Sequence, residues 1–90
     1  MIRISAADVR HFLLAHFSVM IAANGFDPEK IDPEFDLLKE GVIDSLGILE
    51  MADAVEQRFR IRVDFDLMDP AELTVLDKFS AFVAENAVDA

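Results

Sequence analysis

The chain has 90 residues, of which 18 are Asp or Glu and 8 are Lys or Arg, so its formal net charge at pH 7 is −10. So large an acidic excess repels a phosphate backbone and excludes nucleic-acid binding by charge neutralisation. A hydrophobic content of 53% excludes an acidic disordered tail, and the absence of Cys excludes disulfides, thiolate zinc sites and a Cys nucleophile. We therefore expect residues 1–90 to form a single compact acidic domain, near the lower size at which one core is stable.

Residues 5–23 are predicted to form a long first helix. Ser5 and Asp8 have the spacing of a capping box, and Asn24-Gly25 suits the left-handed turn that ends a helix. At 100° per residue the helix has a narrow polar stripe that includes His11, and a broad apolar face opposite it. We expect this face to be buried; its members are Val9, Phe12, Leu13, His16, Phe17, Met20 and Ala23.

The longest uncharged stretch, residues 11–26, is shorter than the roughly 18–20 apolar residues of a membrane-spanning helix. A signal peptide is the alternative interpretation, because Arg3 and Arg10 precede an apolar run. Asp8 and His16 interrupt that pattern, however. We therefore expect a cytoplasmic protein that does not insert into membranes.

Residues 26–44 are predicted to form a long ordered loop, because two prolines, each beside an acid, and Gly41 interrupt any periodic pattern. Loops of this length tend to be functional or to contain a short helical turn. Seven apolar residues should anchor it to the core: Phe26, Ile31, Phe35, Leu37, Leu38, Val42 and Ile43.

A second helix is predicted from Asp44, a good N-cap residue, to Phe59. Its buried side should comprise Ile48, Met51, Ala52, Val55 and Phe59. Residues 59–67 then alternate between apolar and polar, which by itself indicates a strand. Because a single strand would have no partner, we favour an extended connector with one helical turn near residues 65–69.

The last helix is predicted to begin at Thr74, because Thr74 and Asp77 repeat the capping-box spacing. Three substantial helices and one short helix predict an all-α fold, a small four-helix bundle. The buried face of the last helix should comprise Val75, Leu76, Phe79, Phe82 and Val83.

Ser45 is the candidate functional residue. It follows the N-cap, so its hydroxyl lies at the positive end of a helix dipole, where a phosphate attached to it would be held by free backbone N–H groups. The alternative is that Ser45 only shares helix capping with Asp44.

The outward face of the second helix is predicted to dock a partner protein. It carries Leu46 and Leu49 beside Ser45, together with Glu50, Asp53, Glu56 and Gln57. Exposed leucines surrounded by acids suit an interface in which apolar anchors supply affinity and carboxylates select a basic partner. Residues 26–56 contain ten acids and two bases, a net charge of −8.

The residues around Ser45 also resemble a known family. The resemblance is carried by the run Gly41-Val42-Ile43-Asp44-Ser45-Leu46, by Ile48-Leu49-Glu50 after it, and by Phe59. These residues resemble the attachment region of the acyl, aminoacyl and peptidyl carrier proteins, in which Asp-Ser-Leu is the attachment motif. With Val63 and Thr74-Val75 farther on, the resemblance covers nearly the whole chain.

The resemblance implies a monomeric, non-catalytic four-helix carrier with 4′-phosphopantetheine on the Ser45 hydroxyl. In this family a separate Mg²⁺-dependent phosphopantetheinyl transferase moves the arm from coenzyme A, and the arm's thiol carries an acyl or aminoacyl group as a thioester. Further partners would be a loading ligase or synthetase and the enzymes that receive the cargo. The absence of Cys fits, because the installed thiol is then the chain's only one.

The resemblance also implies roles for the neighbours of Ser45. Asp44 stands for the family's acid before the serine, and the partner contacts would fall on Leu46, Leu49, Glu50 and Glu56. Two departures concern the fatty-acid carriers: Gly47 replaces a frequent acid, and Asp53 replaces an apolar contact residue. Ser-Leu-Gly is closer to the aminoacyl carriers, including the D-alanyl type, and to some peptidyl carriers.

Two other readings of the sequence are less favourable. A serine hydrolase of the Gly-Asp-Ser-Leu type needs Gly where Ile43 stands, and it needs a positioned base, for which His11 and His16 are poor candidates. A calcium loop beginning at Asp64 has Asp69 where Gly is required and Val75 where Glu is required.

The remaining alternative function is an unmodified acidic interaction module that docks a basic partner through the second helix. Composition does not separate it from a carrier, because both would show the same acidic face. Only the chemistry of Ser45 distinguishes them.

Overall fold

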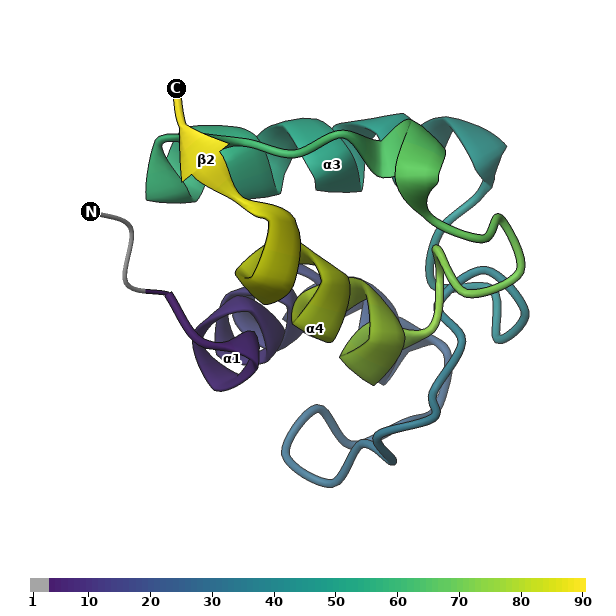
Figure 1. The fold of residues 1–90 in the computed structure, drawn as a ribbon. Coiled ribbons are helices and arrows are strands. Elements are labelled where there is room, and N and C mark those ends of the chain that lie inside the picture. Colours follow the sequence, from purple (N-terminus) through teal and green to yellow (C-terminus); the bar gives the residue numbers. More distant parts are fainter. Residues whose placement is uncertain (1–3) are drawn as a thin grey trace.

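The computed structural model describes residues 4–90, which fold into a small all-α bundle, as predicted. Figure 1 shows α4 crossing α1, with α3 running past both, and the most extensive helix–helix contact is that of α1 with α4. The elements of this part of the chain are α1 (Ala6–His16), α2 (Ser18–Ala23), α3 (Ser45–Phe59), β1 (Ile61–Arg62), the 3₁₀ turn η1 (Phe65–Leu67), α4 (Leu76–Asn86) and β2 (Val88–Asp89).

The predicted first helix is divided in two at Phe17, whose φ of −100° and ψ of 11° lie outside the α-helical range. The capping box at its start is confirmed, since Ser5 and Asp8 exchange backbone-to-side-chain hydrogen bonds of 2.9 and 3.0 Å. The buried residues follow a row with a spacing of four: Val9, Leu13, Phe17 and Ile21.

The prediction that His16, Met20 and Ala23 are buried is wrong, because all three are exposed. Four residues advance 400°, which is 40° more than one full turn, so a buried row with this spacing winds slowly around the helix. Toward the end of the segment the buried row has therefore moved away from the face that carries His16, Met20 and Ala23. The His16 ring packs beside the Phe12 and Phe17 rings, with centroid distances of 5.4 and 4.9 Å.

The loop between α2 and α3 is ordered, and most of its predicted anchors are buried. Phe26 is half-buried, and Leu38 is exposed, at 40%. The Asp36 carboxylate accepts hydrogen bonds from the backbone N–H groups of Leu38 and Lys39, and this local turn leaves the Leu38 side chain in solvent.

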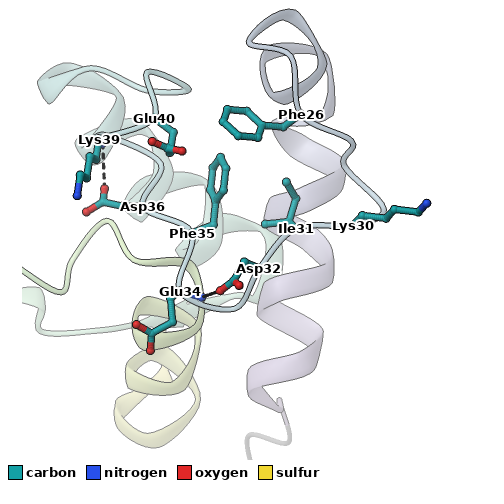
Figure 2. A pocket seen from close by; sticks show the side chains of 9 residues that line it. All are labelled: Phe26, Lys30, Ile31, Asp32, Glu34, Phe35, Asp36, Lys39 and Glu40. Atoms are coloured by element: carbon teal, nitrogen blue, oxygen red, sulfur yellow. Dashed lines mark hydrogen bonds between the residues drawn. The ribbon is translucent and has the colours of Figure 1, made fainter.

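The loop also contains its own aromatic cluster. The Phe26 and Phe35 rings meet edge to face with centroids 4.9 Å apart. Together with Ile31 they line a hollow of about 460 Å³. Figure 2 shows the two rings beside each other in this hollow, while the Lys30 side chain points away from it.

α3 begins and ends as predicted, with Asp44 as N-cap and Arg60 in the left-handed conformation after its last residue. The extended segment that follows has a strand partner that the sequence did not reveal. β1 pairs with β2 in antiparallel fashion, with Ile61 opposite Asp89 and Arg62 opposite Val88. η1 confirms the predicted helical turn.

α4 begins at Leu76, so the predicted capping box at Thr74 is wrong. The Thr74 hydroxyl instead donates to the Asp36 carboxylate at 2.7 Å. The first N–H groups of α4 are satisfied by loop carbonyls, because Leu76 donates to Phe35 O at 2.9 Å and Asp77 donates to Pro33 O at 3.1 Å. The loop therefore caps α4 with its backbone. The expected buried face is present, with Leu76, Phe79 and Val83 buried and Val75 and Phe82 half-buried.

Arg10 joins three parts of the bundle. Its Nε donates to the Asp77 carboxylate of α4 at 2.8 Å, and its Nη2 donates to the Ile31 carbonyl of the loop at 2.7 Å. These contacts hold α1, the loop and α4 together beside the aromatic cluster. Within residues 4–90, no helix has the length and apolar character that crossing a bilayer requires.

Candidate functional site

Ser45 is the first residue of α3, and it is exposed to solvent. Asp44 caps the helix, because its Oδ1 accepts from the Gly47 N–H at 2.8 Å. The other first-turn N–H groups have no acceptor within the helix, and the helix dipole places positive potential around them. The arrangement is therefore able to present the serine oxygen and to accommodate a phosphate attached to it.

The chain leading to Ser45 is held rigidly. The N–H groups of Val42 and Ile43 both donate to the Leu37 carbonyl, at 2.9 and 3.1 Å, and both side chains are buried. Gly41 turns the chain with a φ of 80°, beside Asn24 at the end of α2. The position of the serine is thus fixed by the core rather than by a free loop.

Gly47 is buried and has a packing role that sequence reasoning missed. A Cβ atom at this position would lie 2.8 Å from the Cβ of Ile43, which is too close for two carbon atoms. Glycine is therefore needed so that residues 41–44 can lie against the first turn of α3. The signal in the sequence was the glycine itself: Gly is a poor helix former, so a Gly in the first turn of a predicted helix indicates that something other than helix propensity requires it.

The predicted docking residues lie largely where the helical wheel placed them. Leu46 and Leu49 are 64% and 68% exposed, and Glu50 and Asp53 are exposed beside them. Gln57 is also exposed, and its side chain donates to Asp53 at 2.8 Å.

Glu56 differs from the other predicted docking residues. It is half-buried, and its carboxylate accepts the Val63 N–H at 2.9 Å. It therefore fastens the segment after β1 to α3 and lies at the edge of the exposed face.

A groove flanks the start of α3 on the side of α2. Its volume is about 540 Å³, and its lining includes Phe17, Met20 and residues 41–44, together with Gly47 and Glu50 of α3. Sequence reasoning missed this groove because it placed Met20 in the core. Hereafter we call it the α2–α3 groove.

The structure does not support His11 as the base that the hydrolase interpretation needs. His11 lines a hollow with Arg58 and Phe59, at the far end of α3. Thirteen residues of helix separate Arg58 from Ser45, a distance of about 20 Å at 1.5 Å per residue. His11 therefore lies too far from Ser45 to act as its base.

The acids considered for a calcium loop are used in local turns. Asp64 accepts from the Asp66 N–H at 3.1 Å, and Asp69 accepts from the Ala71 N–H at 2.9 Å. In the described part of the chain, no group of three or more His, Asp or Glu side chains is arranged to hold a metal ion.

Comparison with known proteins identifies the family. No curated protein and no solved structure matches the chain significantly. The family of phosphopantetheine attachment sites matches residues 18–83, which include α2, the loop, α3 and most of α4. The chain therefore belongs to this family, that of the acyl carrier proteins, and its covalent cofactor is 4′-phosphopantetheine.

Proposed function

We propose that Ser45 carries the 4′-phosphopantetheine arm and that residues 1–90 act as one non-catalytic carrier domain for a thioester-bound acyl or aminoacyl group. The observation that carries the proposal is the position of Ser45. It is an exposed hydroxyl at the start of α3, within the Asp-Ser-Leu motif and inside the matched residues 18–83.

Attachment needs only a reachable serine oxygen. A phosphopantetheinyl transferase would join that oxygen to the phosphopantetheine phosphorus of coenzyme A, with adenosine 3′,5′-bisphosphate leaving and the hydroxyl proton passing to a base of the transferase. Once bound, the arm supplies a thiol that forms a thioester with the cargo.

The neighbouring residues of the chain hold Ser45 in place for this step. Asp44 fixes the first turn of α3, and Val42 and Ile43 anchor the preceding segment in the core. First-turn N–H groups offer donors to the phosphate of the arm.

The proposed partner surface is the exposed face formed by Asp44, Leu46, Leu49, Glu50 and Asp53, with Glu56 at its edge. Its two leucines are suited to fill apolar pockets of a partner. Its carboxylates favour a basic partner, since residues 26–56 have a net charge of −8. The partners would be the transferase, a loading ligase or synthetase, and the enzymes that receive the cargo.

The cargo class is a separate question. The resemblance favours an aminoacyl group over a fatty acyl group because Ser-Leu-Gly is closer to the aminoacyl carriers, and to some peptidyl carriers, than to the fatty-acid carriers. Gly47 also has a packing reason to be glycine, because a Cβ there would meet Ile43. The residue by itself is therefore no independent sign of the cargo.

The test is the reaction at Ser45. Incubating the protein with coenzyme A, Mg²⁺ and a broad-specificity phosphopantetheinyl transferase should add the mass of one arm, measured by intact-protein mass spectrometry. Ser45→Ala should abolish the gain, whereas Ser18→Ala, at the start of α2, should leave it unchanged. If the folded wild-type protein gains no mass while a known carrier does, the protein is an unmodified interaction module and the proposal is wrong.

A further inference from the structure

The α2–α3 groove combines apolar walls with acidic groups. Phe17, Met20, Val42 and Ile43 contribute apolar side chains, and Asp44 and Glu50 contribute carboxylates. None of its lining residues is Lys or Arg. A ligand that suits the groove is therefore partly apolar and carries a positive charge.

We propose that the α2–α3 groove is a resting site for an aminoacyl group carried on the arm, with the cargo's ammonium at Glu50 and its thioester end against Met20 and Val42. The inference rests on the proposed attachment at Ser45. It names a cargo class that the attachment alone leaves open.

The tether favours this occupant over a free ligand. Ser45 lies one residue after Asp44 and two residues before Gly47, and both of these line the groove. Two residues of helix advance only about 3 Å, which is short compared with the arm. A flexible tether gives an effective concentration in the millimolar range, so a contact with an intrinsic Kd of about 1 mM would be substantially occupied.

The charge of Glu50 selects among cargoes. Asp44 already accepts the Gly47 N–H with Oδ1, whereas Glu50 is exposed on the rim of the groove. An exposed ion pair alone is weak in water. Here the tether and contact with the apolar walls also stabilise the bound cargo. An uncharged acyl group on the same tether would be stabilised by the apolar walls alone. An aminoacyl group therefore makes one contact that an acyl group of the same size lacks.

The experiment compares three cargoes on the intact protein. The transferase would load it from coenzyme A, propionyl-coenzyme A or alanyl-coenzyme A, so that the products differ only at the end of the arm. Amide ¹H–¹⁵N spectra would be recorded at about pH 6, well below the ordinary α-amino pKa of about 8. We expect the alanyl protein to shift the amides of Gly41, Val42 and Gly47 relative to the other two, and to show a cross-relaxation contact between the alanyl and Met20 methyl groups.

Glu50→Gln should reduce the alanyl-specific shifts at least twofold. The matched control is Glu85→Gln, an exposed acid on α4, which should leave them unchanged. Equal shifts for alanyl and propionyl cargo, with no effect of Glu50→Gln, would overturn the ammonium contact.

Two further outcomes would overturn the resting site itself. One is a spectrum of the alanyl protein identical to that of the protein with the unloaded arm. This result would not contradict the attachment at Ser45, because the gain in mass measures the attachment separately. The other is a groove that responds to butylguanidinium added to the unmodified protein but not to the tethered alanyl group. That result would assign the groove to an Arg side chain of a partner.

Discussion

At the scale of single residues, two opposing effects act at Gly47: helix propensity and steric contact with Ile43. The helix favours Ala over Gly by up to about 1 kcal/mol in its interior. The neighbouring Ile43 opposes any side chain, since a Cβ would lie 2.8 Å from its own Cβ. Both atoms are fixed to backbone, so relief requires movement of residues 41–44 or of the first turn of α3. Overpacking of this kind typically costs about 1–3 kcal/mol.

We therefore predict that Gly47→Ala lowers the free energy of unfolding by about 1–2 kcal/mol, despite its better helix propensity. The measurement is urea unfolding followed by circular dichroism at 222 nm. Ala54→Gly in the same helix is the control, because it reports the propensity effect without the contact to Ile43. A Gly47→Ala protein more stable than wild type would contradict the packing role of Gly47.

At the scale of elements, the periodic segments were predictable and the connections between them were not. α3 has the expected bounds because Asp44 and the spacing of Ile48, Met51 and Val55 are local features. β2 has only two residues, so no pattern marked it as the partner of β1.

The start of α4 shows a second reason for failure. The sequence predicted a local capping box between Thr74 and Asp77. In the structure the Thr74 hydroxyl instead donates a hydrogen bond to the carboxylate of Asp36, 38 residues away. Of the candidate site, Ser45, its cap and its leucines followed from sequence. The α2–α3 groove did not, because it depends on how the chain bends at Phe17.

The contact between Asp36 and Thr74 couples the loop to α4, and it predicts a pH dependence. Partial burial acts to raise the pKa of Asp36, but hydrogen bonds from the Thr74 hydroxyl and from the Lys39 and Leu38 N–H groups outweigh it, so the pKa lies below 3.8. A carboxyl group with a lowered pKa in the folded state stabilises the fold above its unfolded pKa. That stability is lost as the pH falls through the folded pKa.

Thr74→Val should therefore raise the pKa of Asp36 and reduce the part of the stability that is lost in acid. The pKa is measured by NMR titration of the Asp36 carboxyl carbon, and the stability by urea unfolding at several pH values between about 2 and 7. Ser80→Ala is the control, since its hydroxyl bonds to Leu76 O within α4. An unchanged Asp36 titration in Thr74→Val would show that the two backbone N–H groups alone lower the pKa.

At the scale of the whole molecule, charge is distributed unevenly along α3. Glu50 and Asp53 are exposed in its first three turns, whereas Arg58, Arg60 and Arg62 are exposed at and after its end. The molecule thus presents an acidic region around Ser45 and a small basic region at the opposite end. A basic partner approaching Ser45 is attracted by the first region, and this attraction weakens when salt shortens the screening length to below about 10 Å.

We predict that Glu50→Lys raises the KM of the transferase for the protein at least fivefold at low salt, with a smaller effect at high salt. Leu46→Ala should also raise KM, because it removes an exposed apolar anchor. Both variants should keep the wild-type circular dichroism spectrum, since both side chains are exposed.

Glu85→Lys provides the matched control, with the same change in net charge on α4. If Glu50→Lys and Glu85→Lys raise KM equally, net charge alone matters and the docking face is not on α3. Loss of helical signal in Leu46→Ala would instead show that Leu46 supports the fold.

The pairing of β1 with β2 has a practical consequence for handling the protein. The Ala90 N–H donates to the Arg60 carbonyl at 3.4 Å, so the last residue lies beside the end of α3. Fifteen residues of helix place Ser45 about 22 Å away from that end. A fluorophore, an affinity tag or a solid support attached at Ala90 would therefore leave Ser45 accessible to partner enzymes. We therefore expect a protein anchored through Ala90 to keep Ser45 accessible for modification on a surface.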